Sequence, residues 1–205
     1  DFDRNLKEHH FRGGVYDFPS LLAKRNAEQE YFDKELRLEV REERFNRCQA
    51  ALDKLAGVFE KMKPDVLVLI GDDQEEWFFK DVQPSYTIFA GEAILNAGYD
   101  PEKHKDKHPS VQMVEMHRHT PVDTWYECVP DLAHAIIAEC MEAEFDVTAS
   151  QKVPEGPEGP RGIGHAVSFV YRRILRDQAI PLVPILINTF YPPNQPTPKR
   201  CFELG

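Results

Sequence analysis

Apolar and polar positions along the first third of the chain predict helix followed by strand. From Glu28 to Lys61 no proline occurs and apolar residues recur at helical spacing, so one or two long amphipathic helices are expected there. Pro64 ends this region, because proline cannot continue the helical hydrogen-bond ladder. Residues 65–70 (DVLVLI) are apolar on both faces, which is typical of a strand covered by helices on both sides.

The second half of the chain repeats the alternation of helix and strand. Residues 164–178 (GHAVSFVYRRILRDQ) predict a helix, and residues 180–188 (IPLVPILIN) predict a second buried strand. Residues 123–144 predict a further helix, and residues 145–150 (FDVTAS) a further strand. The expected fold is therefore α/β, with a central, mostly parallel sheet flanked by helices on both faces.

Within that sheet, residues 65–70 and 182–188 are expected to be neighbouring parallel strands. Residues 98–121 are polar and turn-rich, so they predict a surface loop, and residues 154–162 predict a Pro/Gly loop. After Asn188 the chain is expected to pass through a proline-stiffened loop into a helix carrying Arg200, which either binds an anion or is a solvated cation.

Composition limits the classes of function. The 205 residues are 41% hydrophobic and 11% aromatic, enough for the core of one domain. Lys and Arg total 25 against 35 for Asp and Glu, giving a net charge of −10. This charge excludes a nucleic-acid or anionic-membrane surface and favours a small-molecule or protein partner.

The cysteines and the chain ends indicate the cellular setting. The four cysteines are scattered without CxxC spacing, and the sequence shows no signal peptide and no apolar run of 18 residues. Free thiols in the reducing cytoplasm are expected, with no membrane association. The chain opens on DFDRNLKEHH without a methionine, so it is expected to be a fragment or a processed chain.

A turn rich in acidic residues follows the first predicted strand. Gly71, Asp72, Asp73 and residues 74–76 (QEE) lie where the carboxyl end of that strand would reach the sheet edge, the position at which open α/β sheets bind ligands. Their oxygen atoms could hold a divalent cation. Alternatively, Asp72 or Asp73 accepts hydrogen bonds from the free amides of a helix N-terminus.

Histidines provide further candidates for chemistry. His165 follows a glycine-rich turn at a helix start, where it suits acid–base catalysis or a purely structural hydrogen bond. Two pairs have spacings that metals can use, and both are also explained as surface-loop histidines: His104 with His108, and His117 with His119. The same two interpretations apply to His9 and His10.

Three segments in order, KPDVLVLIGDDQEEWF, GIGHAVSFVYRRIL and IPLVPILINTFYPPNQPTPKRCFELG, resemble the class III extradiol ring-cleavage dioxygenases, the family of the protocatechuate 4,5-dioxygenase catalytic subunit. The similarity covers roughly residues 40–205. It implies one α/β domain over residues 1–205 that lacks the family's extreme N-terminal and C-terminal segments.

The resemblance implies non-haem Fe(II), held by two histidines and a glutamate, and cleavage of a catechol ring by O2. The position that matches an iron histidine of the family is Asp73, so the resemblance implies Asp73 or the neighbouring Gln74 as a metal ligand. His165 matches the family's pocket histidine, which binds substrate or moves protons, and is expected to face the same cleft as the Gly71–Gln74 turn. The family's other metal ligands have no counterpart in this chain.

The function expected from the resemblance is extradiol cleavage of a catecholic or related aromatic substrate, in a homo-oligomer or with a partner subunit. Two alternatives stay open. The chain could be a non-catalytic family member that serves binding or assembly. It could also be a divalent-metal enzyme of another reaction type, since an aspartate in place of a histidine favours harder ions such as Mg²⁺.

Overall fold

The structure is a computed structural model, which describes residues 9–11, 14–16, 18–156, 159–160 and 162–205. The chain divides into two compact units, Asp1–Asp53 and Lys54–Gly205. Every residue of the predicted site lies in the second unit.

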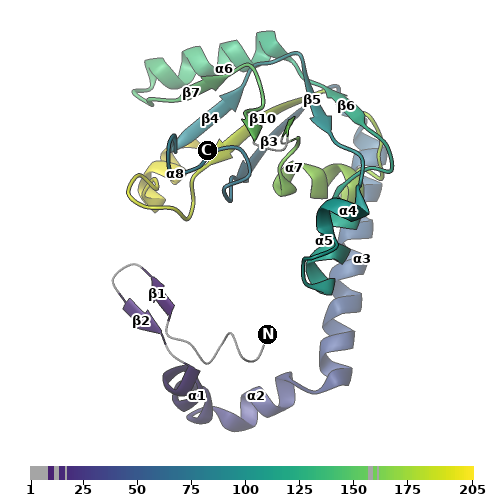
Figure 1. Ribbon diagram of the computed structural model, residues 1–205, viewed down its shortest axis with the longest axis vertical. Helices are drawn as coiled ribbons and strands as arrows, with labels where there is room; N and C mark the ends of the chain where they lie inside the picture. Colours follow the sequence, from purple (N-terminus) through teal and green to yellow (C-terminus); the bar gives the residue numbers. More distant parts are fainter. Residues whose placement is uncertain (1–8, 12–13, 17, 157–158, 161) are drawn as a thin grey trace. The chain divides into compact units, whose positions relative to one another are not determined.

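The described part of the first unit consists of a strand pair followed by helices (Figure 1). Its elements are β1 (His9–Phe11), β2 (Gly14–Tyr16), α1 (Phe18–Asn26), α2 (Gln29–Glu35) and the first part of α3 (Leu38–Met62). The prediction of one or two long helices between residues 28 and 61 is confirmed by α3, which has 25 residues, while α2 is a shorter helix of 7 residues. Where the structure describes side chains of residues 20–53, they are exposed or half-buried.

The second unit contains a four-stranded mixed sheet in the order β3 (Leu67–Asp72), β10 (Leu182–Ile187), β4 (Tyr86–Phe89) and β7 (Thr148–Ser150). Strands β3 and β10 are parallel, with Leu67 opposite Leu182, which confirms that these two segments are neighbours. Strand β4 runs antiparallel to β10 and parallel to β7. The expected α/β class is therefore confirmed, with a small sheet of mixed direction.

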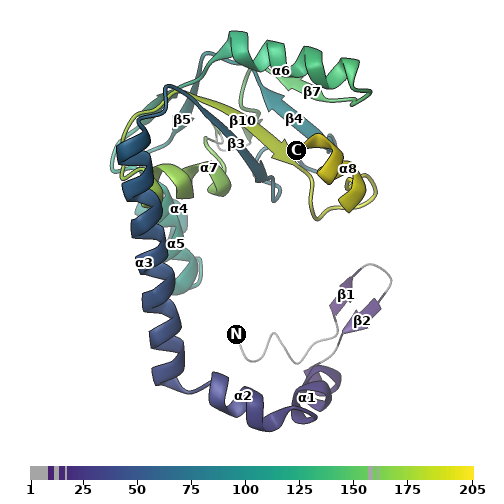
Figure 2. The ribbon, with the colours of Figure 1, turned by 180° about the vertical axis from the view of Figure 1, so that it is seen from behind.

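Two apolar clusters form the core. In β10, Leu182 and Leu186 belong to a cluster with Leu69, Val167 and Tyr171. The intervening residues of β10, Val183 and Ile185, pack instead with Ile88, Ala133 and neighbouring side chains of α6 (Pro130–Glu142), which lies along the sheet in Figures 1 and 2. Because successive side chains of a strand point to opposite faces, the two clusters lie on opposite faces of the sheet.

The prediction that residues 65–70 are covered on both faces is wrong. Leu69 is buried, but Val68 and Ile70 are 49% and 54% exposed. Val68 and Ile70 are exposed because β3 is an edge strand of the sheet. Strand β10 lies between β3 and β4 and is buried along most of its length.

The helix expected over residues 123–144 is shorter than predicted. Residues Thr124–Glu127 form β6, which pairs antiparallel with β5 (Ala93–Asn96), and α6 begins only at Pro130. Proline at a first helical position is favourable, because its missing amide hydrogen is not needed there. The strand expected at 145–150 is confirmed in its last three residues as β7.

The surface loop expected over residues 98–121 is wrong in part, because two helices form within it: α4 (Pro101–His104) and α5 (Pro109–Arg118). Each begins with a proline preceded by a capping side chain. Asp100 accepts a hydrogen bond from the Glu102 amide, and His108 accepts one from the Ser110 amide.

The predicted helix over 164–178 consists of α7 (His165–Phe169) and a π-helical turn, η2 (Val170–Ile174). Before it, β8 (Glu155–Gly156) pairs with β9 (Gly159–Pro160) in the predicted Pro/Gly region. The expected C-terminal helix is confirmed as α8 (Pro198–Leu204).

Arg200 of α8 has defined contacts. Its guanidinium stacks 3.8 Å above the Phe145 ring and donates to the Glu144 carbonyl, so it packs against the end of α6.

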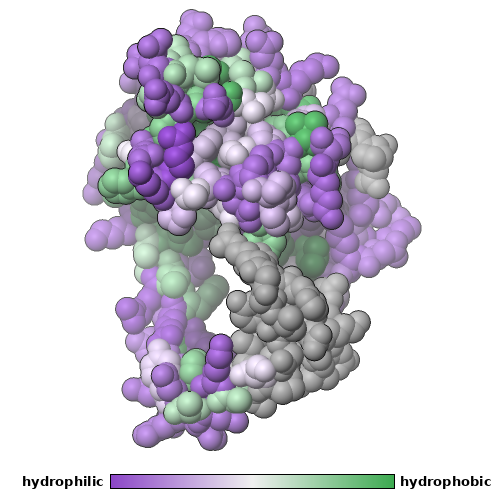
Figure 3. All heavy atoms as spheres, turned by 90° about the vertical axis from the view of Figure 1, so that its left-hand side faces the viewer, coloured by the Kyte–Doolittle hydropathy of each residue, from purple (hydrophilic) through white to green (hydrophobic). Residues whose placement is uncertain are grey.

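Polar side chains predominate on the molecular face shown in Figure 3, with smaller groups of apolar side chains between them. Among the described helices, none is both long enough and apolar enough to cross a membrane.

Candidate functional site

The candidate site lies where the end of β3 meets the start of α7. A Cβ atom added at Gly71 would lie 2.5 Å from the Cβ of Ala166, so a glycine is needed for the strand and the helix to come this close. This close approach places the Gly71–Asp72 backbone beside His165, the first residue of α7. Gly71, which precedes Asp72 at the end of β3, thus sets the distance between β3 and α7.

His165 is held between two carboxylates. Its Nδ1 lies 2.6 Å from Oε2 of Glu76, and its Nε2 lies 3.4 Å from Oδ1 of Asp72. The backbone amide of His165 also donates to both oxygens of Glu76, at 2.9 and 3.0 Å. Because a carboxylate oxygen accepts, Nδ1 carries a hydrogen and Nε2 is the atom that can exchange a proton.

Arg118, the last residue of α5, connects Glu76 to a third carboxylate, that of Glu115. Its Nη2 lies 2.8 Å from Oε1 of Glu76, and its Nε lies 3.5 Å from Oε2 of Glu115. The guanidinium therefore compensates the charge of the carboxylate that orients His165.

A cleft of about 830 Å³ opens beside His165, a volume typical of small-molecule sites. Its wall combines apolar side chains with cations, and the following residues line it: Ile70, Gly71, Asp72, Met113, Val114, His117, Arg118, His165, Ala166, Ser168, Phe169, Arg172, Arg173 and Asp177. The cleft thus joins His165 to Gly71 and Asp72, while Asp73 and Gln74, the other two residues of the turn expected to share it, are not among its lining residues.

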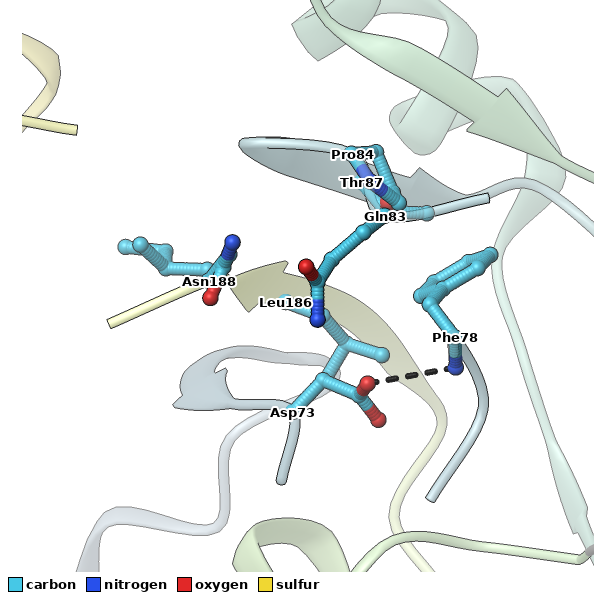
Figure 4. A pocket seen from close by; sticks show the side chains of 8 residues that line it. Asp73, Phe78, Gln83, Pro84, Thr87, Leu186 and Asn188 are labelled. Carbon is cyan, nitrogen blue, oxygen red and sulfur yellow. Dashed lines mark hydrogen bonds between the residues drawn. The ribbon is translucent and has the colours of Figure 1, made fainter. Parts of the chain in front are cut away.

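Asp73 lies elsewhere. It is 8% exposed, and its carboxylate accepts hydrogen bonds from the amides of Trp77 (2.9 Å) and Phe78 (3.2 Å). Figure 4 shows it beside Phe78 and Gln83 in a small separate pocket. Burial raises the pKa of the Asp73 carboxyl, while the Trp77 and Phe78 amides act in the opposite direction.

The resemblance also implies a ferrous ion held by Asp73 or Gln74. Each Asp73 oxygen accepts an amide hydrogen, and the Gln74 side chain donates to Oδ2 of Asp72 at 2.9 Å. A facial triad needs three side chains that present lone pairs to one point, and the turn in this conformation does not fit that requirement. Asp73 accepts backbone amides as the capping interpretation predicts, but no helix begins in the described segment between β3 and β4, so the helix N-terminus of that interpretation is wrong. The metal role of Asp73 and Gln74 stays a prediction.

The histidines of residues 98–121 are rearranged relative to the predicted pairs. His108 caps α5, and Nδ1 of His117 lies 2.7 Å from the Met113 carbonyl. The remaining member of each pair, His104 and His119, converges instead on Glu115. The spacing of the histidines correctly indicated His104 and His119 as candidate ligands, but it paired them with His108 and His117 instead of with each other and Glu115.

Glu115 is the most strongly perturbed acid of this region. The hydrogen bond with His119 and the charges of Arg118 and Lys107 lower its pKa to about 2, against the effect of burial. Burial and the charge of Lys107 lower the pKa of His104. Glu115 is therefore ionised and His104 neutral near neutral pH.

Sequence reasoning missed three contributors to these sites: Glu76 as the partner of His165, Arg118, and Glu115. Glu76 was visible as part of the acidic turn, but its contact with His165 spans 89 residues. Arg118 and Glu115 lie in the segment that the sequence predicts as a loop, where no helical spacing is expected, and α5 brings them together.

Comparison of the sequence with protein-family models and with curated proteins gave no match. The similarity of the three segments to extradiol dioxygenases is thus a hypothesis, and the geometry around His165 is the independent observation on which a function can be argued.

Proposed function

We propose that this chain is an extradiol-type ring-cleaving dioxygenase for a catecholic or related small aromatic substrate. The observation that carries the proposal is His165, fixed by Glu76 and Asp72 at the wall of the 830 Å³ cleft. A histidine with one nitrogen fixed and the other directed toward a second carboxylate suits proton transfer with a phenolic hydroxyl.

The proposed role of His165 follows from its contacts. Glu76 keeps the hydrogen on Nδ1, so Nε2 accepts the proton that a catechol loses when it becomes a catecholate. Asp72, at 3.4 Å from Nε2, stabilises the imidazolium that results. Glu76 is therefore a positioning residue, and His165 is the group that meets the substrate.

The wall of the cleft suits an aromatic ring with an anionic substituent. Met113 and Phe169 offer apolar surface to a ring, and Arg172 and Arg173 bring positive charge to the same cleft.

In the proposed reaction O2 is the oxidant, and a ferrous ion, when bound, would supply the redox chemistry. Because the Gly71–Gln74 turn does not fit that ion in this conformation, the role of His165 is proposed independently of the metal's position.

The proposal includes the predicted architecture and setting. We infer that α6 on one face and α7 on the other provide the two-sided helical cover of the sheet. The four free cysteines support a reducing, cytoplasmic location. A homo-oligomer or a complex with a partner subunit completes the expected assembly.

The test is oxygen consumption by the chain supplied with Fe(II) and a panel of catechols, with absorbance of the ring-opened product as a second readout. We expect His165→Gln to reduce turnover by about 10²-fold or more, the size of a lost acid–base group. His134→Gln, which changes an exposed histidine of α6, is the matched control and should retain turnover. Equal turnover in all three proteins would overturn the assignment of His165.

A second candidate, a non-catalytic binding member of the family, is favoured by one observation. The amide bonds of Asp73 leave the turn without the metal ligand that catalysis would require there. In that case calorimetry would detect catechol binding that His165→Gln weakens, while the iron-supplied chain would consume no oxygen.

A further inference from the structure

A second cluster of chemistry-bearing side chains lies outside the His165 site. His104 ends α4, Glu115 lies in the last turns of α5, and His119 follows that helix. One ligand atom from each of these three residues lies within 4.8 Å of the others, and all three side chains are partly buried. Two imidazoles and a carboxylate are a donor set that borderline divalent transition metals prefer.

His119 is oriented for this purpose. Its Nδ1 lies 2.8 Å from the carbonyl oxygen of Ala97. A carbonyl oxygen can only accept, so Nδ1 carries a hydrogen. Nε2 faces Glu115 and is the nitrogen that would coordinate an ion, after releasing the hydrogen that it shares with Glu115 in the absence of metal. Metal-binding histidines are commonly fixed in this way by a second partner.

The spacing fits a tetrahedral ion. Nε2 of His119 lies 3.4 Å from Oε2 of Glu115. Two ligands of a tetrahedral zinc ion with bonds of about 2.1 Å are separated by about 3.4 Å. The pair is therefore already spaced as two ligands would be.

The ion pair of His119 and Glu115 does not explain the position of His104. Its Nδ1 is buried and has no hydrogen-bond partner among the described residues. Its ring stacks on Tyr99, with centroids 5.4 Å apart, and its centroid lies 5.8 Å from that of His119. A buried polar atom without a partner is costly, and coordination to an ion could satisfy this ring.

We propose that His104, Glu115 and His119 bind one divalent transition-metal ion of the Zn²⁺ class. The ion connects α4 and α5 to the Ala97–Tyr99 segment and keeps a fourth coordination position for water or another ligand. Lys107 and Arg118 contact Glu115 at 3.2 and 3.5 Å, so their positive charges are expected to weaken the affinity for a cation. This site is separate from the Gly71–Gln74 turn and does not rest on the proposed dioxygenase activity.

The experiment titrates the complete chain, freed of metal with a chelator, with Zn²⁺ in a calorimeter and measures retained zinc by elemental analysis. One equivalent is expected. His104→Gln, Glu115→Gln and His119→Gln should each weaken binding about tenfold or more. Visible absorption bands of bound Co²⁺ should be reduced in the same variants.

Two controls remove histidines elsewhere and should leave the affinity unchanged: His134→Gln and the double variant His9→Gln/His10→Gln. Circular dichroism and thermal melting in chelator establish that each ligand variant is folded, and the isosteric Glu115→Gln is the reference if a histidine variant is not. Failure of the wild-type chain to bind Zn²⁺, or binding that only the His9/His10 variant abolishes, would overturn the proposal.

Discussion

At the residue scale, Asp73, which is predicted as a metal ligand, accepts hydrogen bonds from backbone amides. Its carboxylate satisfies the amides of Trp77 and Phe78, which follow it in the turn. We expect Asp73→Ala to lower the free energy of unfolding by about 1–3 kcal/mol, because two amides lose their acceptor in a buried setting. Asp73→Asn keeps one acceptor oxygen and should cost about 1 kcal/mol or less. Urea denaturation measures both.

The control for Asp73 is Glu139→Ala, which removes an exposed carboxylate of α6 and should change stability by less than about 0.5 kcal/mol. Iron retention after dialysis separates the two interpretations of the turn. If Asp73→Asn releases iron that the wild-type chain holds, while the unfolding curve stays in place, the metal role is supported and the capping role alone is insufficient.

At the element scale, the junction of β3 and α7 depends on a missing side chain. Gly71→Ala would place a methyl group 2.5 Å from the Cβ of Ala166. Strand and helix must then separate, and we expect a loss of about 1–3 kcal/mol in stability, typical of overpacking. The same separation would move His165 away from Asp72.

Gly57 of α3 provides the matched control for Gly71. No atom lies within 4 Å of a Cβ built at Gly57. Gly57→Ala should therefore stabilise the helix by about 0.5–1 kcal/mol, because alanine loses less backbone entropy. Urea midpoints for both variants test the pair, and equal shifts in the same direction would refute the packing explanation for Gly71.

At the scale of the whole molecule, burial is unevenly distributed along the chain. Strand β10 is almost fully buried, whereas Leu38 and Phe45 in the first part of α3 are 59% and 62% exposed. We expect backbone amides of Leu182–Ile187 to exchange with deuterium far more slowly than those of residues 38–53, since local opening is easiest where few apolar contacts must break. Hydrogen exchange with mass spectrometry measures this. Equal protection would contradict the prediction and indicate that a second copy or a partner covers Leu38 and Phe45.

Much of the architecture could be read from local patterns. The apolar runs at 65–70 and 182–188 correctly predicted two neighbouring parallel strands, and the proline-rich segment after Asn188 correctly predicted a loop that ends in a helix. The helices α4 and α5 could also have been predicted, because Asp100-Pro101 and His108-Pro109 are helix-start signals within a polar segment.

The sequence by itself determined the α/β class, the acidic turn after β3 and the presence of His165 at a helix start, because these depend on residues close together in the chain. Only the tertiary structure decided which carboxylate contacts which histidine. Glu76 and His165 are in contact although they are 89 residues apart in the sequence. His119 contacts Glu115, four residues before it, and not its predicted partner His117, because residues 109–118 form a helix. Such contacts depend on how helices and strands pack, and the packing is set by apolar burial over the whole unit rather than by the spacing of the polar residues themselves.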